Sequence, residues 1–126
     1  MGKQSIQMKS LGSGKYLHFN AKGVLHADGD ESCYLLQRKD GEKYQFISPT
    51  DASHMVAMNK EGNPERDAVE EHSWFTLVQQ GRQNVYSVRS PMADYFIGFD
   101  EHGNWCPCKD SDDSDFGKVE ITPYSE

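Results

Sequence analysis

Basic residues are scarce in this chain of 126 residues: 13 lysines and arginines stand against 20 aspartates and glutamates, for a formal net charge of −7. A protein that binds nucleic acid without sequence preference needs basic side chains to neutralise phosphates, so we expect no nucleic-acid partner. The acidic balance also disfavours an anionic membrane surface. No apolar run approaches the roughly 20 residues of a membrane-spanning helix, so we expect no membrane insertion.

Export signals and disulfides are also hard to find. The first residues, MGKQSIQMK, hold no apolar stretch of the kind that a signal peptide contains. The three cysteines, Cys33, Cys106 and Cys108, are few and odd in number, whereas small secreted domains carry more cysteines in pairs. We expect reduced thiols, in a chain that is either cytoplasmic or extracellular as a mature or unconventionally exported protein.

Catalytic motifs are absent from the sequence as well. It contains no GxSxG, no glycine-rich phosphate loop and no carboxylate pair in a recognisable motif, so we expect neither an enzyme nor a cofactor. Cys106 and Cys108 stand two residues apart and on a strand would share one face, with His102 nearby. A structural zinc site needs four ligands, and the second pair is missing, so we interpret them as ordinary strand cysteines and expect no metal.

What the sequence does contain is a pattern that occurs three times. Each copy has a large apolar residue, a Leu, Val or Ile, a variable residue, another apolar residue, Asn or Asp, two further residues and Gly. The apolar residues predict a short strand, the Asn or Asp opens a turn, and the Gly takes a positive φ. The copies are Tyr16–Gly23 (YLHFNAKG), Met55–Gly62 (MVAMNKEG) and Phe96–Gly103 (FIGFDEHG).

Strand-like runs flank every octapeptide, and turn signals separate them. No segment has a sustained 3.6-residue period, so we expect no helix beyond a single turn. This makes about four short strands per repeat and about twelve in all. The runs before the octapeptides are Ile6–Lys9, Tyr44–Ile47 and Val85–Val88, ending ahead of Ser10, Ser48 and Ser90; those after them are Val24–His26, Tyr34–Gln37, Trp74–Val78, Trp105–Cys108 and Val119–Ile121.

Three such units are too few for a propeller, which needs at least four blades. Closed around a pseudo-threefold axis, they predict an all-β protein with the β-trefoil fold: a six-stranded barrel capped by three hairpins. We expect a single domain over residues 1–126, with repeats at about 5–43, 44–83 and 84–124. The equivalent positions expected in the core are Phe19, Met58 and Phe99, and, in related packing, Leu17, Val56 and Ile97.

The motifs within the repeats resemble those of the fibroblast growth factor family and the related interleukin-1 branch. GKYLHFNAKGVLHADGD is similar to the opening repeat of these growth factors, HMVAMNKEGN to their second repeat, and NVYSVRSPMADYFIGFDEHGNW to their third. The resemblance spans roughly residues 6 to 124 and rests mostly on scaffold residues. It implies a growth-factor or cytokine-like signalling ligand that binds the ectodomain of a cell-surface receptor, usually aided by heparan sulfate.

The resemblance also implies three receptor-binding residues. Asn84 and Tyr86 match the family's Asn-x-Tyr before the third repeat, and Tyr124 offers an aromatic anchor near the C-terminus. Two tyrosines that the family carries on this surface are replaced here, by Lys9 and Gln83. A signalling ligand of this sequence is therefore a divergent one.

The loop that binds heparan sulfate in the family is basic, whereas the matching stretch here, KDSDDSDFGK, is acidic. Such a surface repels a sulfated polysaccharide, so we expect a ligand that works without heparan sulfate. A calcium loop starting at Asp110 would need glycine and glutamate where Asp115 and Ile121 stand, so we interpret the stretch as a solvated acidic loop. The acidic residues in place of the heparin site are Asp100, Glu101, Asp110, Asp112, Asp113 and Asp115.

Two other functions fit a trefoil. GKYLHFNAKGVLHA is also similar to the repeat of fascin-type actin-bundling domains, which implies an intracellular actin-binding or scaffold module, although fascin-type chains carry several trefoils in tandem. Ricin-type lectins carry Gln-x-Trp in each repeat, which this chain lacks, so a carbohydrate-binding trefoil of another kind is the remaining alternative.

The charge pattern leads to a first prediction. At physiological salt the purified protein should pass through a heparin column unretained, because its net charge of −7 and its acidic loop both repel sulfate groups. Retention that is reversed by added salt would contradict this prediction.

Overall fold

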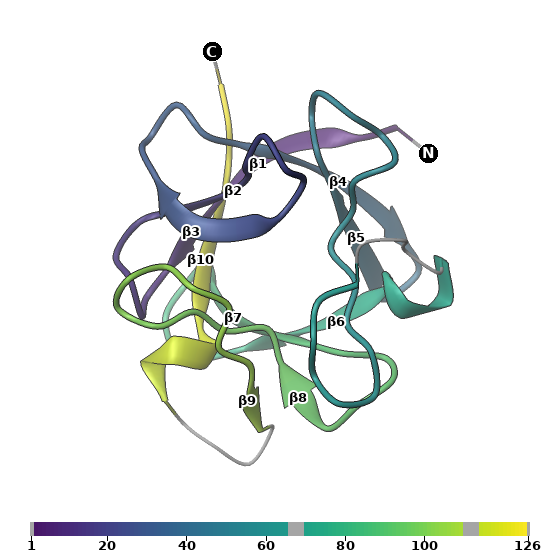
Figure 1. The fold of residues 1–126 in the computed structure, drawn as a ribbon, viewed down its shortest axis with the longest axis vertical. Helices are drawn as coiled ribbons and strands as arrows, with labels where there is room; N and C mark the ends of the chain where they lie inside the picture. The colour runs from purple at the N-terminus through teal and green to yellow at the C-terminus, as the bar shows by residue number, and fades with distance from the viewer. Residues whose placement is uncertain (1, 66–69, 110–113, 126) are drawn as a thin grey trace.

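A closed barrel of six antiparallel strands forms the body of the computed structural model, which describes residues 2–65, 70–109 and 114–125 (Figure 1). Each strand pairs with the next in the order given below, and the last pairs back with the first, so the barrel has no open edge. The strands are β1 (Gln4–Ser10), β4 (Leu35–Asp40), β5 (Lys43–Ile47), β6 (Phe75–Gln79), β7 (Val85–Arg89) and β10 (Val119–Pro123). The predicted all-β trefoil is confirmed.

The hairpins that cap the barrel are less regular than predicted. The first is a proper ladder between β2 (Tyr16–Phe19) and β3 (Leu25–Gly29), and the third pairs β8 (Tyr95–Phe96) with β9 (Cys108–Lys109). Elsewhere the cap is held by isolated bridges, Met58 with Pro64 and Phe99 with Trp105. The described residues therefore contain ten strands rather than about twelve, because a proline such as Pro64 has no N–H to extend a ladder.

Among the described residues, helical structure is confined to two single turns, η1 (Glu70–His72) and η2 (Asp115–Gly117), as the lack of helical periodicity predicted. Within the described ranges, no helix has the length and apolar character needed to cross a membrane.

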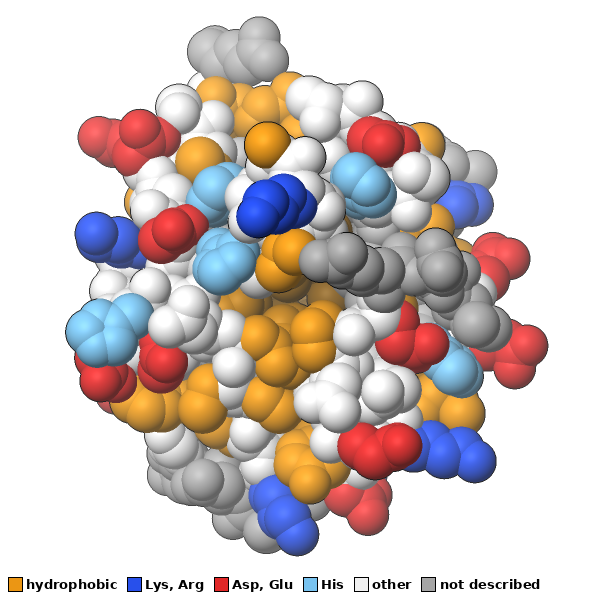
Figure 2. All heavy atoms as spheres, viewed as in Figure 1, with side chains coloured by type: hydrophobic (Ala, Val, Ile, Leu, Met, Phe, Trp, Pro, Cys, Tyr) orange, Lys and Arg blue, Asp and Glu red, His pale blue; other side chains and the backbone are white. Residues whose placement is uncertain are grey.

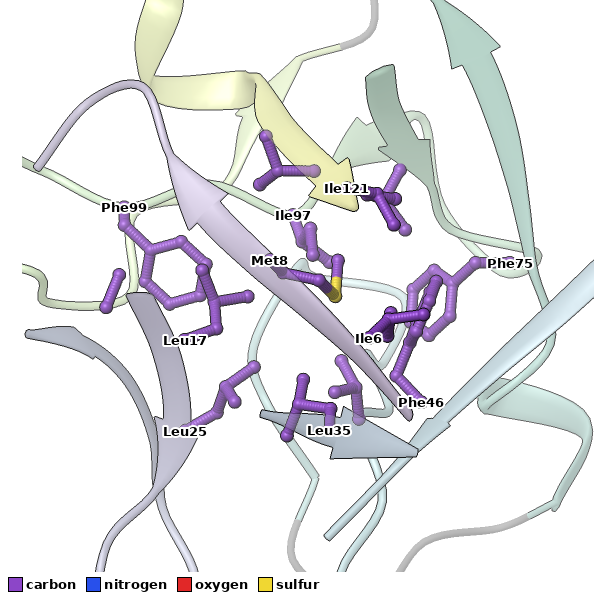
Figure 3. Close-up of a cluster of buried hydrophobic side chains, with 14 of the residues drawn as sticks. Ile6, Met8, Leu17, Leu25, Leu35, Phe46, Phe75, Ile97, Phe99 and Ile121 are labelled. Carbon is purple, nitrogen blue, oxygen red and sulfur yellow. The ribbon is translucent and has the colours of Figure 1, made fainter. Parts of the chain in front are cut away.

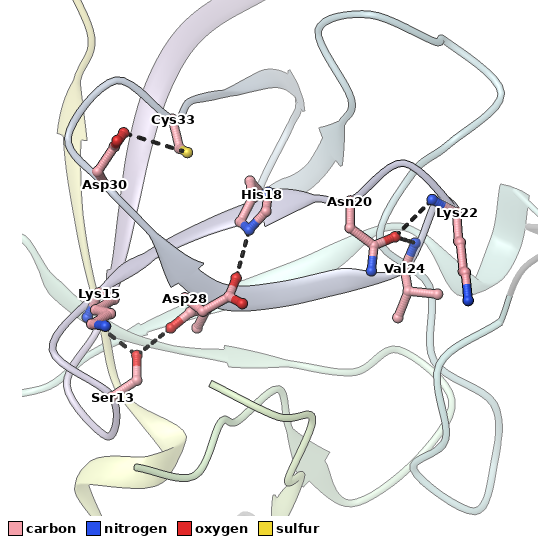
Figure 4. A network of polar contacts seen from close by, with 10 residues as sticks. Ser13, Lys15, His18, Asn20, Lys22, Val24, Asp28, Asp30 and Cys33 are labelled. Atoms are coloured by element: carbon pink, nitrogen blue, oxygen red, sulfur yellow. Dashed lines mark hydrogen bonds and ion pairs between the residues drawn. The ribbon is translucent and has the colours of Figure 1, made fainter. Parts of the chain in front are cut away.

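The three octapeptides form three copies of one turn. In each copy the Asn or Asp side-chain oxygen Oδ1 accepts hydrogen bonds from the backbone N–H groups two and four residues later, at 2.9–3.1 Å. The glycine three residues on has a φ of 77°, 84° or 82°, which side chains other than glycine rarely adopt. The first copy, Asn20 with Lys22 and Val24, is drawn in Figure 4. The turn residues are Asn20, Asn59 and Asp100, with Gly23, Gly62 and Gly103.

A buried serine ends the first strand of each repeat in the same way. Its backbone N–H donates to a carbonyl in the residue just before the octapeptide, and its side-chain oxygen accepts from backbone N–H groups of the intervening loop. These bonds fix the path from barrel strand to cap in all three repeats. The serines are Ser10, Ser48 and Ser90.

The core fills the barrel from all three repeats (Figure 3). Leu17, Val56 and Ile97 are buried as predicted, at no more than 3% exposure. Met58 and Phe99 are also buried, at 0%. Phe19 differs, because it is only half-buried: it packs against the core cluster, stacks on His54 and lines a pocket in the cap.

One buried polar network interrupts this apolar core. The amide of Gln45 donates to the hydroxyl of Ser73 at 2.8 Å and accepts from Arg38 at 3.1 Å, and Ser73 donates in turn to the carbonyl of Glu70. Every buried side-chain nitrogen or oxygen among the described residues has a partner, as a stable interior requires.

Core packing should dominate stability. Phe46→Ala, which removes a fully buried ring beside Phe75, should lower the free energy of unfolding by about 3–5 kcal/mol. Val78→Ala, at a side chain 37% exposed on the neighbouring strand β6, should lower the free energy of unfolding by much less. Urea denaturation of both variants measures the difference, and similar losses for the two would contradict it.

Candidate functional site

The barrel opens onto a shallow groove at the end away from its hairpin cap. All six barrel strands contribute to its lining, so the groove lies where the pseudo-threefold axis leaves the barrel. Its volume is about 140 Å³. The lining residues form two sets of three, one residue from each repeat in each set: Ile6, Tyr44 and Tyr86, and then Gln37, Leu77 and Ile121, joined by Gln4, Thr122 and Pro123.

Strand pairing explains why these residues converge. Ile6, Tyr44 and Tyr86 each stand four residues before the serine that ends their strand. Each also pairs across the sheet with a buried core residue of the next barrel strand, Leu35, Phe75 or Val119 respectively. Equal register in three repeats places the three side chains at one level of the barrel.

The members of this level are not equally covered. Ile6 is 2% exposed, whereas Tyr44 and Tyr86 are only half-buried, so two tyrosine rings and Leu77 reach solvent at the groove. The ammonium of Lys39 lies 5.6 Å from the centre of the Tyr44 ring, a cation–π contact that holds the ring in place. Tyr44, Leu77 and Tyr86 also line a neighbouring depression along β5, β6 and β7.

The structure places the three predicted receptor-binding residues around this groove rather than together in it. Tyr86 lines it directly. Tyr124 follows the lining residue Pro123 and stacks on Tyr34, with ring centres 4.5 Å apart and planes at 5°. Asn84 ends the turn before β7 with a φ of 69°, and its carbonyl accepts from the N–H of Ile121 at 2.8 Å.

Asn84 therefore has a clear structural task. A positive φ is unfavourable for most side chains, and asparagine tolerates it best after glycine. Its role in receptor binding stays a prediction.

The described members of the acidic set are each engaged locally. Asp100 caps its turn, Glu101 lies 3.6 Å from the ring nitrogen Nε2 of His102, and Asp115 lies 3.7 Å from the ammonium of Lys118. Glu101 and Asp115 are well exposed, which agrees with a solvated surface. The remaining three, Asp110, Asp112 and Asp113, lie outside the described residues.

Two aspartates of the cap illustrate how these carboxylates are held. Hydrogen bonds from the backbone N–H groups of Asn104 and His102 lower the pKa of Asp100 from its ordinary value of 3.8. In the first hairpin, a hydrogen bond from His18 Nε2 at 2.6 Å lowers the pKa of Asp28 (Figure 4). Both carboxylates therefore stabilise local turns or strands as anions.

The cysteines do not form the strand pair that their spacing suggested. Only Cys108 lies in β9, where it is buried and its thiol contacts the carbonyl of Cys106 at 3.7 Å. In the described part of the chain, no group of three or more His, Cys, Asp or Glu side chains is placed to hold a metal ion.

Sequence reasoning missed most of the groove. It treated Tyr44 as part of a strand and did not single out Gln37 or Leu77. A signal was present: when the three repeats are aligned on Ser10, Ser48 and Ser90, the position four residues earlier holds isoleucine in the first repeat and tyrosine in the other two. The alignment cannot show that this level lies at the barrel mouth.

The carboxylate of Asp100 should make the Tm of the protein depend on pH. Because folding lowers the pKa of Asp100, its contribution to stability is present above pH 3.8 and is lost as the pH falls from there through the lower folded value. Asp100→Asn keeps the acceptor, as Asn20 and Asn59 show in the other repeats, but removes the charge. The fall in Tm between pH 7 and pH 3 should be smaller in this variant than in the wild type.

Asp100→Ala serves as the comparison, because it removes the acceptor and should lower Tm at both pH values. If Tm falls by the same amount between pH 7 and pH 3 in the wild type and in Asp100→Asn, the lowered pKa of Asp100 is contradicted.

Comparisons with known proteins support the fold. No protein-family model matches the chain, and no curated protein matches its sequence. A solved structure of a salivary protein from Culex, of the Cysteine and Tryptophan-Rich (CWRC) family, superposes with a TM-score of 0.75 at 7% identity over 98% of this chain and 95% of that one. The designed threefold-symmetric protein ThreeFoil superposes with a TM-score of 0.73 at 11% identity over 95% of this chain and 99% of that one. At such low identities these similarities establish a shared threefold trefoil architecture and leave function to the site itself.

Proposed function

We propose that this protein is a non-enzymatic ligand of a partner protein, in the manner of a growth factor or cytokine, and that it docks on the ectodomain of a cell-surface receptor through the open end of its barrel. The groove there, with its two half-buried tyrosines, is the observation that carries the proposal. The resemblance of the three repeats to fibroblast growth factors supports the receptor as the class of partner.

The composition of the groove suits protein recognition. Tyrosine is enriched where binding energy concentrates in protein interfaces, because its ring buries much apolar area while its hydroxyl stays hydrogen-bonded. Tyr44 and Tyr86 supply two such rings, and Leu77 and Pro123 add apolar surface between polar neighbours. At about 140 Å³ the groove is too small to enclose a typical small-molecule ligand, which favours a surface contact.

The stacked pair Tyr34 and Tyr124 extends this surface. Stacking with ring centres at 4.5 Å fixes both side chains before any partner arrives, so little rotamer entropy is lost on binding. The proposal therefore includes Tyr124, which the family resemblance implies as a receptor contact, in the docking surface. The net charge of −7 supports docking by protein contact without heparan sulfate as a bridge.

A matched pair of substitutions tests the docking surface. The purified protein is first used to capture its partner from a panel of extracellular receptor domains. Leu77→Gln, inside the groove, should then weaken binding to the captured domain by at least about tenfold, as loss of an interface anchor does. Val78→Gln, the next residue on β6 but exposed and outside the groove, should leave the affinity within about twofold.

Thermal unfolding of both variants confirms that they are folded. Capture of no receptor domain and no labelling of live cells would overturn the proposal. Equal affinities for the two variants would move the docking surface elsewhere and overturn the assignment of the groove. Co-sedimentation with actin filaments, without receptor capture, would instead favour the fascin-like alternative.

A further inference from the structure

A second depression lies in the hairpin cap and shares no lining residue with the groove. Figure 2 shows hydrophobic side chains gathered around a hollow at the centre of the face that Figure 1 presents. The pocket has a volume of about 200 Å³ and is lined mainly by apolar side chains. Its lining includes Leu25, Pro64 and Trp105, which each stand five residues after the Asn or Asp of their turn, so the three hairpins converge on it.

The walls of this cap pocket are held rigidly. The indole N–H of Trp105 donates to the carbonyl of Gly62 at 2.8 Å, and its ring meets that of Phe99 edge-on, with ring centres at 5.8 Å. The first repeat contributes Phe19, which stacks on His54, and the second contributes Val56, which is buried. A pocket whose walls are fixed in this way loses little entropy when a ligand enters.

Among the described residues that line the pocket, Glu65 is the one with an ionisable side chain. Its carboxylate is 19% exposed, and one oxygen, Oε1, contacts Nδ1 of His72. Its backbone N–H donates to the carbonyl of Ala57, which anchors the residue to the opposite edge of the hairpin. A carboxylate has about four lone-pair sites, so Glu65 keeps the capacity to accept a further hydrogen bond from a ligand.

We propose that the cap pocket binds a small aromatic amine, with its ring among Phe19, Leu25 and Trp105 and its ammonium group at Glu65. An apolar cavity of about 150 Å³ is enough to hold a benzene molecule, so 200 Å³ suits one ring with a short tail. The negative carboxylate and the net charge of −7 select a cation over an anion of the same shape.

Three compounds of similar shape test the charge preference: 2-phenylethylamine, the neutral 2-phenylethanol and the anionic 3-phenylpropionate. Titrations followed by NMR at neutral pH should give the tightest binding for the amine and the weakest for the carboxylate. The chain has two tryptophans, so the indole N–H spectrum holds one signal for Trp105 in the pocket and one for Trp74 outside it. The Trp105 signal should shift on titration and the Trp74 signal should not.

Two substitutions separate the charge from the cavity. Glu65→Gln should weaken binding of the amine about tenfold and leave 2-phenylethanol unchanged, because the substitution removes the negative charge and nearly preserves the shape of the side chain. Glu42→Gln, at an exposed residue outside the pocket, removes the same charge and should change neither. Val24→Phe, which fills the pocket from its half-buried edge, should abolish binding of all three compounds.

Val78→Phe adds the same ring at an exposed site outside the pocket and controls for surface hydrophobicity. The proposal is overturned if 3-phenylpropionate binds as tightly as the amine, if Glu65→Gln leaves the amine's affinity unchanged, or if the Trp74 signal shifts in place of that of Trp105. Absence of binding by the amine at millimolar concentration overturns it as well. None of these results bears on receptor capture, which depends on the other end of the barrel.

Discussion

The packing of three repeats around one axis is the constraint on which this structure depends. At each level of the barrel, three side chains from different parts of the chain share a single space, and their volumes must fill it together. Met8, Phe46 and Val88 occupy one such level, and all three are buried completely. Because a six-stranded barrel is narrow, the buried residues of the three repeats pack against one another in a single core cluster.

The turns and serines of each repeat make this convergence possible. Asn20, Asn59 and Asp100 hold the cap turns with the same side-chain hydrogen bonds, and the buried serines hold the strand ends. Local geometry is thus almost threefold even though the sequences differ. Asparagine and aspartate are interchangeable in the turn because both present an acceptor oxygen in the same place, and the aspartate adds only a charge with a lowered pKa.

Departures from symmetry occur where the axis reaches the surface. At the open end, two tyrosines and one isoleucine share a level, and the unequal side chains leave a groove. In the cap, leucine, proline and tryptophan share the equivalent place around the pocket. A perfectly symmetric sequence would present the same side chain three times at each end of the barrel. Because the repeats have diverged, each end instead presents three different surroundings to a ligand. The two proposed binding sites are both consequences of this divergence.

Local pattern in the sequence was sufficient to predict the fold, the barrel strands and the three turns, because each depends on residues close together in the chain. The alternation of apolar residues, the Asn or Asp of each turn and its glycine all act within eight residues or fewer. Much of the cap and of the candidate site could not be predicted in this way. The reduction of the second hairpin to a single bridge and the half-exposure of Phe19 depend on how separate hairpins meet.

The same holds for the functional surfaces. The family resemblance named Tyr86, which does line the groove, but Tyr44 and Leu77 join it only because β5, β6 and β7 bring them to one level. Glu65 and Trp105 lie far apart in the chain and meet at a pocket that only closure of the three repeats creates. The sequence by itself determined the repeated local structure, since short-range hydrogen bonds and side-chain alternation specify it. Tertiary structure decided which unequal residues face each other across the axis, because that depends on contacts between all three repeats at once.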